Sequence, residues 1–168
     1  MDVLTEFKVP YLGLKDGLHQ FEFKIGKAFF VAFDNLEVES ADIELVIELD
    51  KKTTMVVADF KFRGKVEMPC ARCMENVHTS VEGSERIVYK FHGEEDIDDE
   101  TIVFVPPHLG EIDLSPQAYE IMVVNFPLRV VHEDISECNQ DVIEKLKDLK
   151  PKVNNNPQWE ELLKLKSE

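Results

Sequence analysis

Two cysteines, Cys70 and Cys73, are separated by two residues, and this spacing is the strongest chemical signal in the 168-residue chain. Thiolates at this spacing can share one tetrahedral zinc ion, form a redox couple, or pack a turn as reduced thiols. A redox couple of the thioredoxin type needs the pair at the start of a helix that follows a strand. The residues on both sides of the pair are instead typical of strands, so a thiol redox protein is the least favoured reading.

A complete structural zinc site needs four ligands, and the rest of the chain offers few. Cys138 is the third and last cysteine, and His132 precedes it by six residues. Together with the pair, these two residues would complete a Cys₃His set. The chain lacks a second paired-cysteine motif, so we expect no cofactor. If Cys70, Cys73, Cys138 and His132 come together, zinc is the metal that they would hold. The alternative is that reduced thiols pack the end of a strand and its turn.

Basic residues near the pair form a candidate partner-binding surface. Lys61, Arg63 and Lys65 alternate along one predicted strand, so they share one face, opposite its apolar residues. With Arg72 they would form a local patch able to bind the phosphates of RNA, since Arg presents a planar fork of donors. An ion pair with a nearby acidic side chain is an equally suitable role for Arg72.

A second candidate surface lies at the carboxyl end of the chain. Trp159, Leu162 and Leu163 recur at helical spacing after a polar stretch that is rich in asparagine. Such an apolar stripe either docks on its own domain or enters a groove of another protein, with Trp159 as the anchor. We therefore predict one α+β domain over residues 1–150, followed by a polar linker and a short helix over residues 151–168.

The charge of the chain restricts its partners. Its 34 Asp and Glu outnumber 19 Lys and Arg, which gives a net charge of −15, and six acids crowd into residues 93–100. This sign opposes sequence-independent binding to RNA, which depends on cations that neutralise phosphates. It favours a basic protein partner, because opposite fields raise the encounter rate. We interpret residues 93–100 as a solvated loop that could attract such a protein.

No pattern in the chain indicates an enzyme. The nucleophile-elbow, His-Glu-x-x-His and Walker patterns are missing, and the five histidines are scattered without motif spacing. The amino end carries acids rather than the basic and apolar regions of a secretory signal, and the apolar runs are too short to span a membrane. With an odd number of cysteines, these features predict a cytoplasmic protein whose thiols are reduced.

The elements that must position these residues are mostly strands. Apolar and polar residues alternate over residues 21–25, 43–50, 55–68 and 76–91, the period of half-buried strands. The last three of these read as an antiparallel meander, in which Gly64 indicates a bulge or bend. The fold class that follows is α+β, a twisted antiparallel sheet with short helices gathered in the carboxyl-terminal part.

Helices are predicted mainly after the sheet. A helix should begin with Ser115 as its N-cap and end by Pro127, and a second should cover residues 141–150. Residues 101–106 read as a short returning strand. The apolar run over residues 26–33 fits either a short helix or a buried strand, and its periodicity does not decide between them.

Three blocks of sequence, in this order, resemble the YceD family of bacterial and plastid proteins, which are linked to accumulation of large-subunit ribosomal RNA. The blocks are "MPCARC", "EIDLSPQAYEIMVVNFPLRVVHED" and "NPQWEELLKLK", and the resemblance covers residues 64–166. Arg72 matches an arginine of the family motif, and some members carry further cysteines in the region of Cys138. The genes of the family often lie beside one for a small, basic ribosomal protein.

The resemblance implies a non-enzymatic ribosome biogenesis factor that supports accumulation of large-subunit (23S-type) ribosomal RNA. The acidity of the chain favours action through a basic large-subunit ribosomal protein. The alternative is a protein that binds precursor ribosomal RNA directly through Lys61, Arg63, Lys65 and Arg72.

Overall fold

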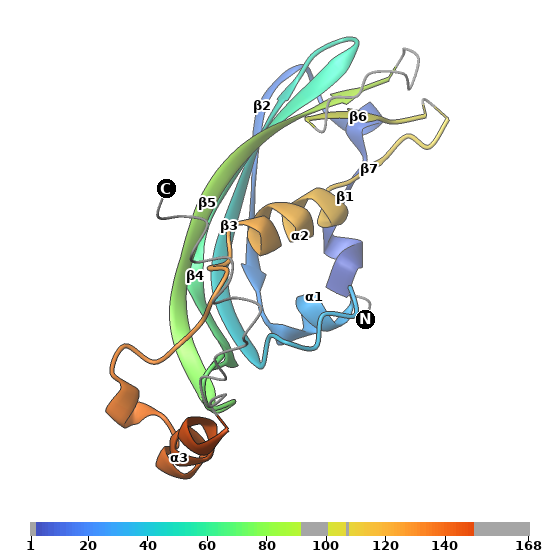
Figure 1. Ribbon diagram of the computed structural model, residues 1–168. Coiled ribbons are helices and arrows are strands. Elements are labelled where there is room, and N and C mark those ends of the chain that lie inside the picture. The colour runs from blue at the N-terminus through green and yellow to red at the C-terminus, as the bar shows by residue number, and fades with distance from the viewer. Residues whose placement is uncertain (1–2, 92–100, 107, 150–168) are drawn as a thin grey trace, which may run out of the picture. The chain divides into compact units, whose positions relative to one another are not determined.

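A computed structural model describes residues 3–91, 101–106 and 108–149, and its main element is a five-stranded sheet (Figure 1). The strands follow the order β2-β3-β4-β5-β6 and the first four are antiparallel to their neighbours, whereas β6 runs parallel to β5. Their bounds are Gly17–Ile25 (β2), Ser40–Lys51 (β3), Met55–Pro69 (β4), Asn76–Lys90 (β5) and Ile102–Phe104 (β6). The predicted antiparallel meander and the α+β class are confirmed.

The core lies on one face of this sheet, as the alternation of the sequence predicts. Over residues 43–49 and 56–62, every second side chain of β3 and β4 points to this face and is buried, whereas the residues between them are more exposed and mostly polar. The buried residues of these two strands are Ile43, Leu45, Ile47, Leu49, Val56, Ala58, Phe60, Phe62 and Val66.

Short elements cover the apolar face. Figure 1 shows α1 (Lys27–Val31) and α2 (Ser115–Val124) on the concave side of the curved sheet. The amino-terminal segment lies on the same side, with η1 (Val3–Phe7), and η2 (Tyr11–Gly13) follows in sequence after β1 (Lys8–Val9), which pairs with β7 (Ile112–Asp113). The apolar run over residues 26–33, whose sequence fitted either a helix or a strand, therefore contains a helix.

The start of α2 differs from the prediction. Ser115 is the first helical residue rather than the N-cap, and its side chain is buried. Its backbone N–H and its hydroxyl both donate to Oδ1 of Asp113, at 2.9 and 2.6 Å. Leu114 takes the N-cap position, and no side chain caps the helix there, so the N-cap prediction for Ser115 is wrong.

Gly64 marks a close approach of strands instead of a bulge. The register of β4 passes through it without interruption, pairing it with Ile43 on one side and Val81 on the other. A Cβ atom at Gly64 would collide with the backbone of Asp42 and Ile43. The glycine thus lets neighbouring backbone approach on the concave side, where a side chain would hold it away.

Residues 132–149 follow the sheet unit as a second compact unit. They contain η3 (Ile135–Glu137) and α3 (Gln140–Asp148), which confirms the second predicted helix within a residue or two. Asn139 caps α3 by accepting from the backbone N–H of Val142 at 3.3 Å. Among the described residues, no helix has both the length and the apolar character that crossing a membrane requires.

Two predictions fall outside the described residues. The acidic run over residues 93–100 is one, and the linker and helix predicted for residues 151–168 are the other. The predicted domain boundary at residue 150 lies at the edge of the described part, and it stays a prediction.

Candidate metal centre

Cys70 and Cys73 stand in the tight turn that joins β4 to β5. The register of the two strands ends with Pro69 opposite Asn76, so six residues must reverse the chain. Within the turn, the N–H of Cys70 donates to the carbonyl of Glu75 at 2.8 Å, and the N–H of Met74 donates to the carbonyl of Cys70 at 2.9 Å. Both thiols are buried. The pair does not stand at the start of a helix, the setting that a thioredoxin-like couple uses.

The backbone of the turn also contacts one of the sulfurs. The N–H of Arg72 donates to Sγ of Cys70 at 3.4 Å. Met74 has φ of 65°, in the left-handed region that L residues rarely adopt. Its side chain is 72% exposed, so packing of that side chain does not impose the conformation. The turn itself holds the strained residue.

The chain passes this turn again after α2. The N–H of Ala71 donates to the carbonyl of Val130 at 2.8 Å, which fixes residue 130 beside the turn. His132 is two residues further on, and two residues span at most about 7 Å. No pattern in the sequence announced Val130, because a backbone carbonyl leaves no mark on residue type.

His132 and Cys138 form a pair of their own. Nδ1 of the His132 ring lies 3.5 Å from Sγ of Cys138, and the thiol of Cys138 is buried. The segment between them contains η3, where the carboxylate of Asp134 accepts from the N–H of Ser136 at 2.8 Å. This short helix turns the chain so that residues six apart in sequence bring their side chains together.

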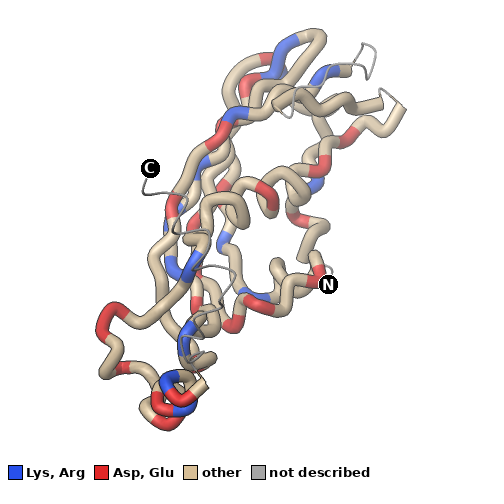
Figure 2. Tube along the Cα trace, in the orientation of Figure 1, with Lys and Arg blue, Asp and Glu red and all other residues tan. Residues whose placement is uncertain are grey.

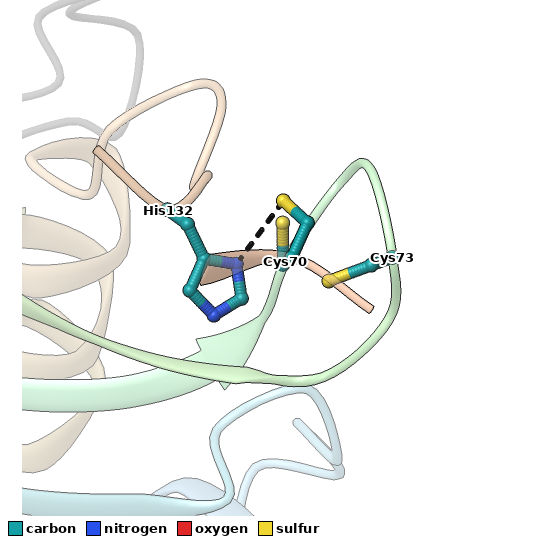
Figure 3. Close-up of side chains that lie close together, drawn as sticks. Cys70, Cys73 and His132 are labelled. Atoms are coloured by element: carbon teal, nitrogen blue, oxygen red, sulfur yellow. Dashed lines mark hydrogen bonds between the residues drawn. The ribbon is translucent and has the colours of Figure 1, made fainter. Parts of the chain in front are cut away.

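The four residues that the sequence analysis selected as a Cys₃His set form one cluster. One ligand atom from each of Cys70, Cys73, His132 and Cys138 lies within 4.8 Å of all the others. Figure 3 shows the side chains of Cys70, Cys73 and His132 close together. Three sulfurs and one imidazole nitrogen at this separation are a set that could hold a metal ion, and their types match a structural zinc site.

The predicted basic stripe is present on the opposite face of the sheet from the core, but it is not a block of unpaired charge. Lys61, Arg63 and Lys65 are all exposed there. Nζ of Lys61 lies 2.8 Å from a carboxylate oxygen of Glu48, and a guanidinium nitrogen of Arg63 lies 3.2 Å from Glu44. The hydrogen bond and charge of Glu48 raise the pKa of Lys61. Figure 2 shows acidic and basic residues interleaved along these strands.

Of the remaining predicted partner-binding residues, the structure describes only Arg72. Arg72 is half-buried in the cysteine turn, beyond the end of β4 and apart from the stripe along that strand. Trp159, Leu162 and Leu163 lie outside the described residues.

Exposed apolar side chains beside the turn were missed by the sequence analysis. Leu36, Met74 and Leu128 are largely exposed and line one shallow groove, together with Ala71 and Arg129. They come from three separate segments, and none belongs to a periodic pattern, so only the fold brings them together.

Residues 58–166 of the chain match the family described as "Large ribosomal RNA subunit accumulation protein YceD", and this region contains all four residues of the cluster. The chain is also similar to the Uncharacterized protein YlbN of Bacillus subtilis (strain 168), with 28% identity over 88 residues. That alignment covers 52% of this chain and 50% of the relative, so the chain spans about half the length of the curated protein that it matches. No solved structure matches the chain.

Proposed function

This chain belongs to the YceD family, and from this we propose that it is a non-enzymatic factor in biogenesis of the large ribosomal subunit. Its role is to support the accumulation of large-subunit, 23S-type ribosomal RNA. The observation that carries the proposal is the family match over residues 58–166, whose description concerns ribosomal RNA and names no catalysed reaction. A metal held by Cys70, Cys73, His132 and Cys138 would be structural, because four protein ligands would leave no open position for a substrate.

For the partner, we propose a basic protein of the large subunit. The net charge of −15 favours association with a cationic surface and disfavours contact with phosphates. The sheet supports the same choice, since Glu48 and Glu44 already occupy Lys61 and Arg63. Trp159, Leu162 and Leu163 are the residues that we propose as an apolar anchor for this partner. Because its three cysteines are free thiols and its family description concerns ribosomal RNA, we place this activity in the cytoplasm.

Direct binding of precursor ribosomal RNA is the second candidate function. The observation in its favour is the position of Lys61, Arg63 and Lys65 on one exposed face of β4. Exposed ion pairs contribute only about 0–1 kcal/mol, so phosphates could displace Glu48 and Glu44 at small cost. Arg72 would add a planar group for a phosphate near the end of the same strand.

Removing the two glutamates separates these functions by the sign of the effect. The double variant Glu44→Gln/Glu48→Gln frees Lys61 and Arg63 and makes the surface less acidic. If the partner is a basic protein, association should slow, and the difference from wild type should shrink as salt rises. If RNA is bound directly, the same variant should bind it more tightly.

The measurement is the association rate of the full-length protein with two probes, a basic large-subunit ribosomal protein and a precursor ribosomal RNA fragment, at several salt concentrations. The matched control is Lys61→Ala/Arg63→Ala/Lys65→Ala, which should not slow association with the basic protein, because it makes the surface more acidic. Tight binding of wild type to the RNA at physiological salt, weakened by the triple variant, would refute the protein partner and establish the second function.

A further inference from the structure

We propose that the outer edge of β5 over residues 76–87 is a docking site for an extended segment of a basic protein, which adds to the sheet as a further strand. This inference rests on the proposed function, because it gives the basic partner a place of contact and a conformation. It is carried by the backbone groups that β5 leaves unpaired, by the groove beside them and by the charges around both.

Only the last part of β5 has a neighbouring strand on its outer side. β6 pairs with residues 88–90 of β5, and Figure 1 shows it beside one end of that long strand. From Asn76 to Ile87, β5 pairs with β4 alone in the described part of the chain. Over this length β5 is therefore an edge of the sheet, and an unpaired edge is where an extended segment of another chain can add.

Hydrogen bonds at the two ends of β5 show which of its backbone groups face outward. Just before the strand, the carbonyl of Glu75 accepts from the N–H of Cys70 on the β4 side at 2.8 Å. Near its other end, the N–H of Val88 donates away from β4, to the carbonyl of Thr101, at 2.8 Å. Backbone groups point to alternate sides along a strand, and the register with β4 is uninterrupted. Odd-numbered residues of β5 therefore face β4, and even-numbered residues face outward.

The even-numbered residues offer their N–H and carbonyl groups to a new strand. Among the described residues, none of these groups between residues 76 and 87 has a backbone partner on the outer side. The N–H of Arg86 donates instead to a carboxylate oxygen of its neighbour Glu85, at 3.2 Å. This carboxylate does for Arg86 what the carbonyl of a neighbouring strand would do. The outward-facing residues are His78, Ser80, Glu82, Ser84 and Arg86.

A groove lies between this edge and α2. Its volume is about 630 Å³, and its apolar lining is made by Ile87, Ile121 and Val124. The two isoleucines are buried, whereas the side chain of Val124 is 83% exposed. Side chains alternate between the two faces of a strand, so every second side chain of an added strand would face this groove. The groove therefore fits a segment with apolar residues at alternate positions.

The charges around the edge select a cationic segment. Glu85 and Glu120 line the groove, and no Lys or Arg is among the described residues that line it. Glu82 is exposed on the edge itself. Arg86 is the one Lys or Arg within residues 76–87, and its guanidinium donates to the carboxylate of Asp59 at 2.6 and 3.1 Å. An added strand that carries Lys or Arg would be attracted by these carboxylates, whereas RNA phosphates would be repelled.

A second copy of this chain is the competing occupant, since the edges of identical sheets can pair. Pairing two copies along β5 would bring the acids of both edges together, and each chain carries a net charge of −15. Like charges on neighbouring strands are destabilising. A cationic segment of a different protein is therefore the favoured occupant.

The test uses the full-length protein and a peptide of alternating Val and Lys, about nine residues long, which matches the length of the free edge. Hydrogen exchange of single backbone N–H groups is measured by NMR with and without the peptide. We expect the peptide to protect the N–H groups of Ser80 and Ser84, which face outward. Those of Val81 and Gly83 face β4 and should be protected in both samples. A peptide that does not bind, or gained protection that lacks this alternation, would overturn the proposal.

A backbone variant separates strand addition from attraction by charge alone. Ser84→Pro removes an outward N–H but keeps every charge and the hydrogen bonds to β4, and proline is tolerated where the N–H of an edge strand faces solvent. It should weaken peptide binding by about tenfold or more, whereas the matched control Ser84→Ala should bind as wild type does. Equal affinities of the two variants would contradict strand addition.

A second form of this test needs no substitution, so it holds even if Ser84→Pro fails to fold. A peptide of the same sequence that is N-methylated at every residue keeps its charges but has no backbone N–H to donate. It should bind wild-type protein about tenfold or more weakly than the unmodified peptide. Equal binding of the two peptides would contradict strand addition.

The acids of the groove are tested separately. Glu85→Gln/Glu120→Gln should weaken peptide binding at low salt, and the difference from wild type should shrink as salt rises. The control Glu6→Gln/Glu22→Gln removes the same charge from η1 and β2 and should have a smaller effect. Equal losses in the two double variants would show that net charge alone attracts the peptide. Dimers of wild-type protein with the same protected edge and no peptide would assign the edge to a second copy. Either result would overturn the proposal.

These outcomes are distinguishable from failure of the proposed function. Peptide binding that ignores Ser84→Pro would refute the docking edge and leave the basic partner of the proposed function standing. Direct binding of precursor ribosomal RNA through Lys61, Arg63 and Lys65 would refute that partner, while alternating protection along β5 would still establish an edge that accepts a cationic strand.

Discussion

At the scale of single residues, the cysteine turn shows which part of the site the sequence could predict. The spacing of Cys70 and Cys73, with Cys138 and His132 as the remaining ligand candidates, was sufficient to select a Cys₃His set, because few side chains bind zinc. The left-handed φ of 65° at Met74 could not be predicted, since methionine does not favour that region and glycine would have been the signal for it.

Replacement of Met74 tests whether the turn imposes this conformation. Met74→Gly should stabilise the protein by up to about 1 kcal/mol, because it removes the left-handed penalty at some entropic cost in the unfolded chain. Met74→Val should instead destabilise it by about 1 kcal/mol or more, since β-branched residues are the least tolerant of positive φ. Chemical denaturation measures both. Equal stabilities for wild type and both variants would show that residue 74 is not left-handed in solution.

At the scale of elements, alternation predicted the long strands well because one face of the sheet is buried and the other is not. The run containing Phe29 and Phe30 could not be assigned, since both residues are buried and neither period stands out. The same limit applies to the N-cap of α2. Ser115 has a side chain typical of an N-cap, but only the structure shows that its N–H and hydroxyl both donate to Asp113 while Leu114 takes the N-cap position.

Gly64 gives a prediction at this scale. Gly64→Ala should destabilise the fold by roughly 1–3 kcal/mol, because its Cβ would meet the backbone of Asp42 and Ile43, which can move only by disturbing the sheet. The matched control is Gly13→Ala, where a Cβ meets nothing within 4 Å, and its stability should change by no more than about 0.5 kcal/mol. Thermal unfolding of both variants measures the difference. A Gly64→Ala variant as stable as Gly13→Ala would disprove the close approach of β3.

At the scale of the whole molecule, the net charge and the pairing of charged side chains both bear on the partner that we propose. The net charge of −15 is visible in the sequence. The pairing of Lys61 with Glu48 and of Arg63 with Glu44 depends on the register of β3 and β4, which places these residues on neighbouring strands. Sequence analysis therefore identified the basic stripe on β4 but could not show that acidic residues accompany it.

The most direct measurement of the biogenesis role is the ratio of large-subunit to small-subunit ribosomal RNA in cells with and without the gene. We predict that the ratio falls when the gene is deleted and that the wild-type protein, supplied from a plasmid, restores it. Quantifying both RNAs in the same extract removes any effect of growth rate on total RNA. A ratio that is unchanged by the deletion would contradict the role proposed for this protein.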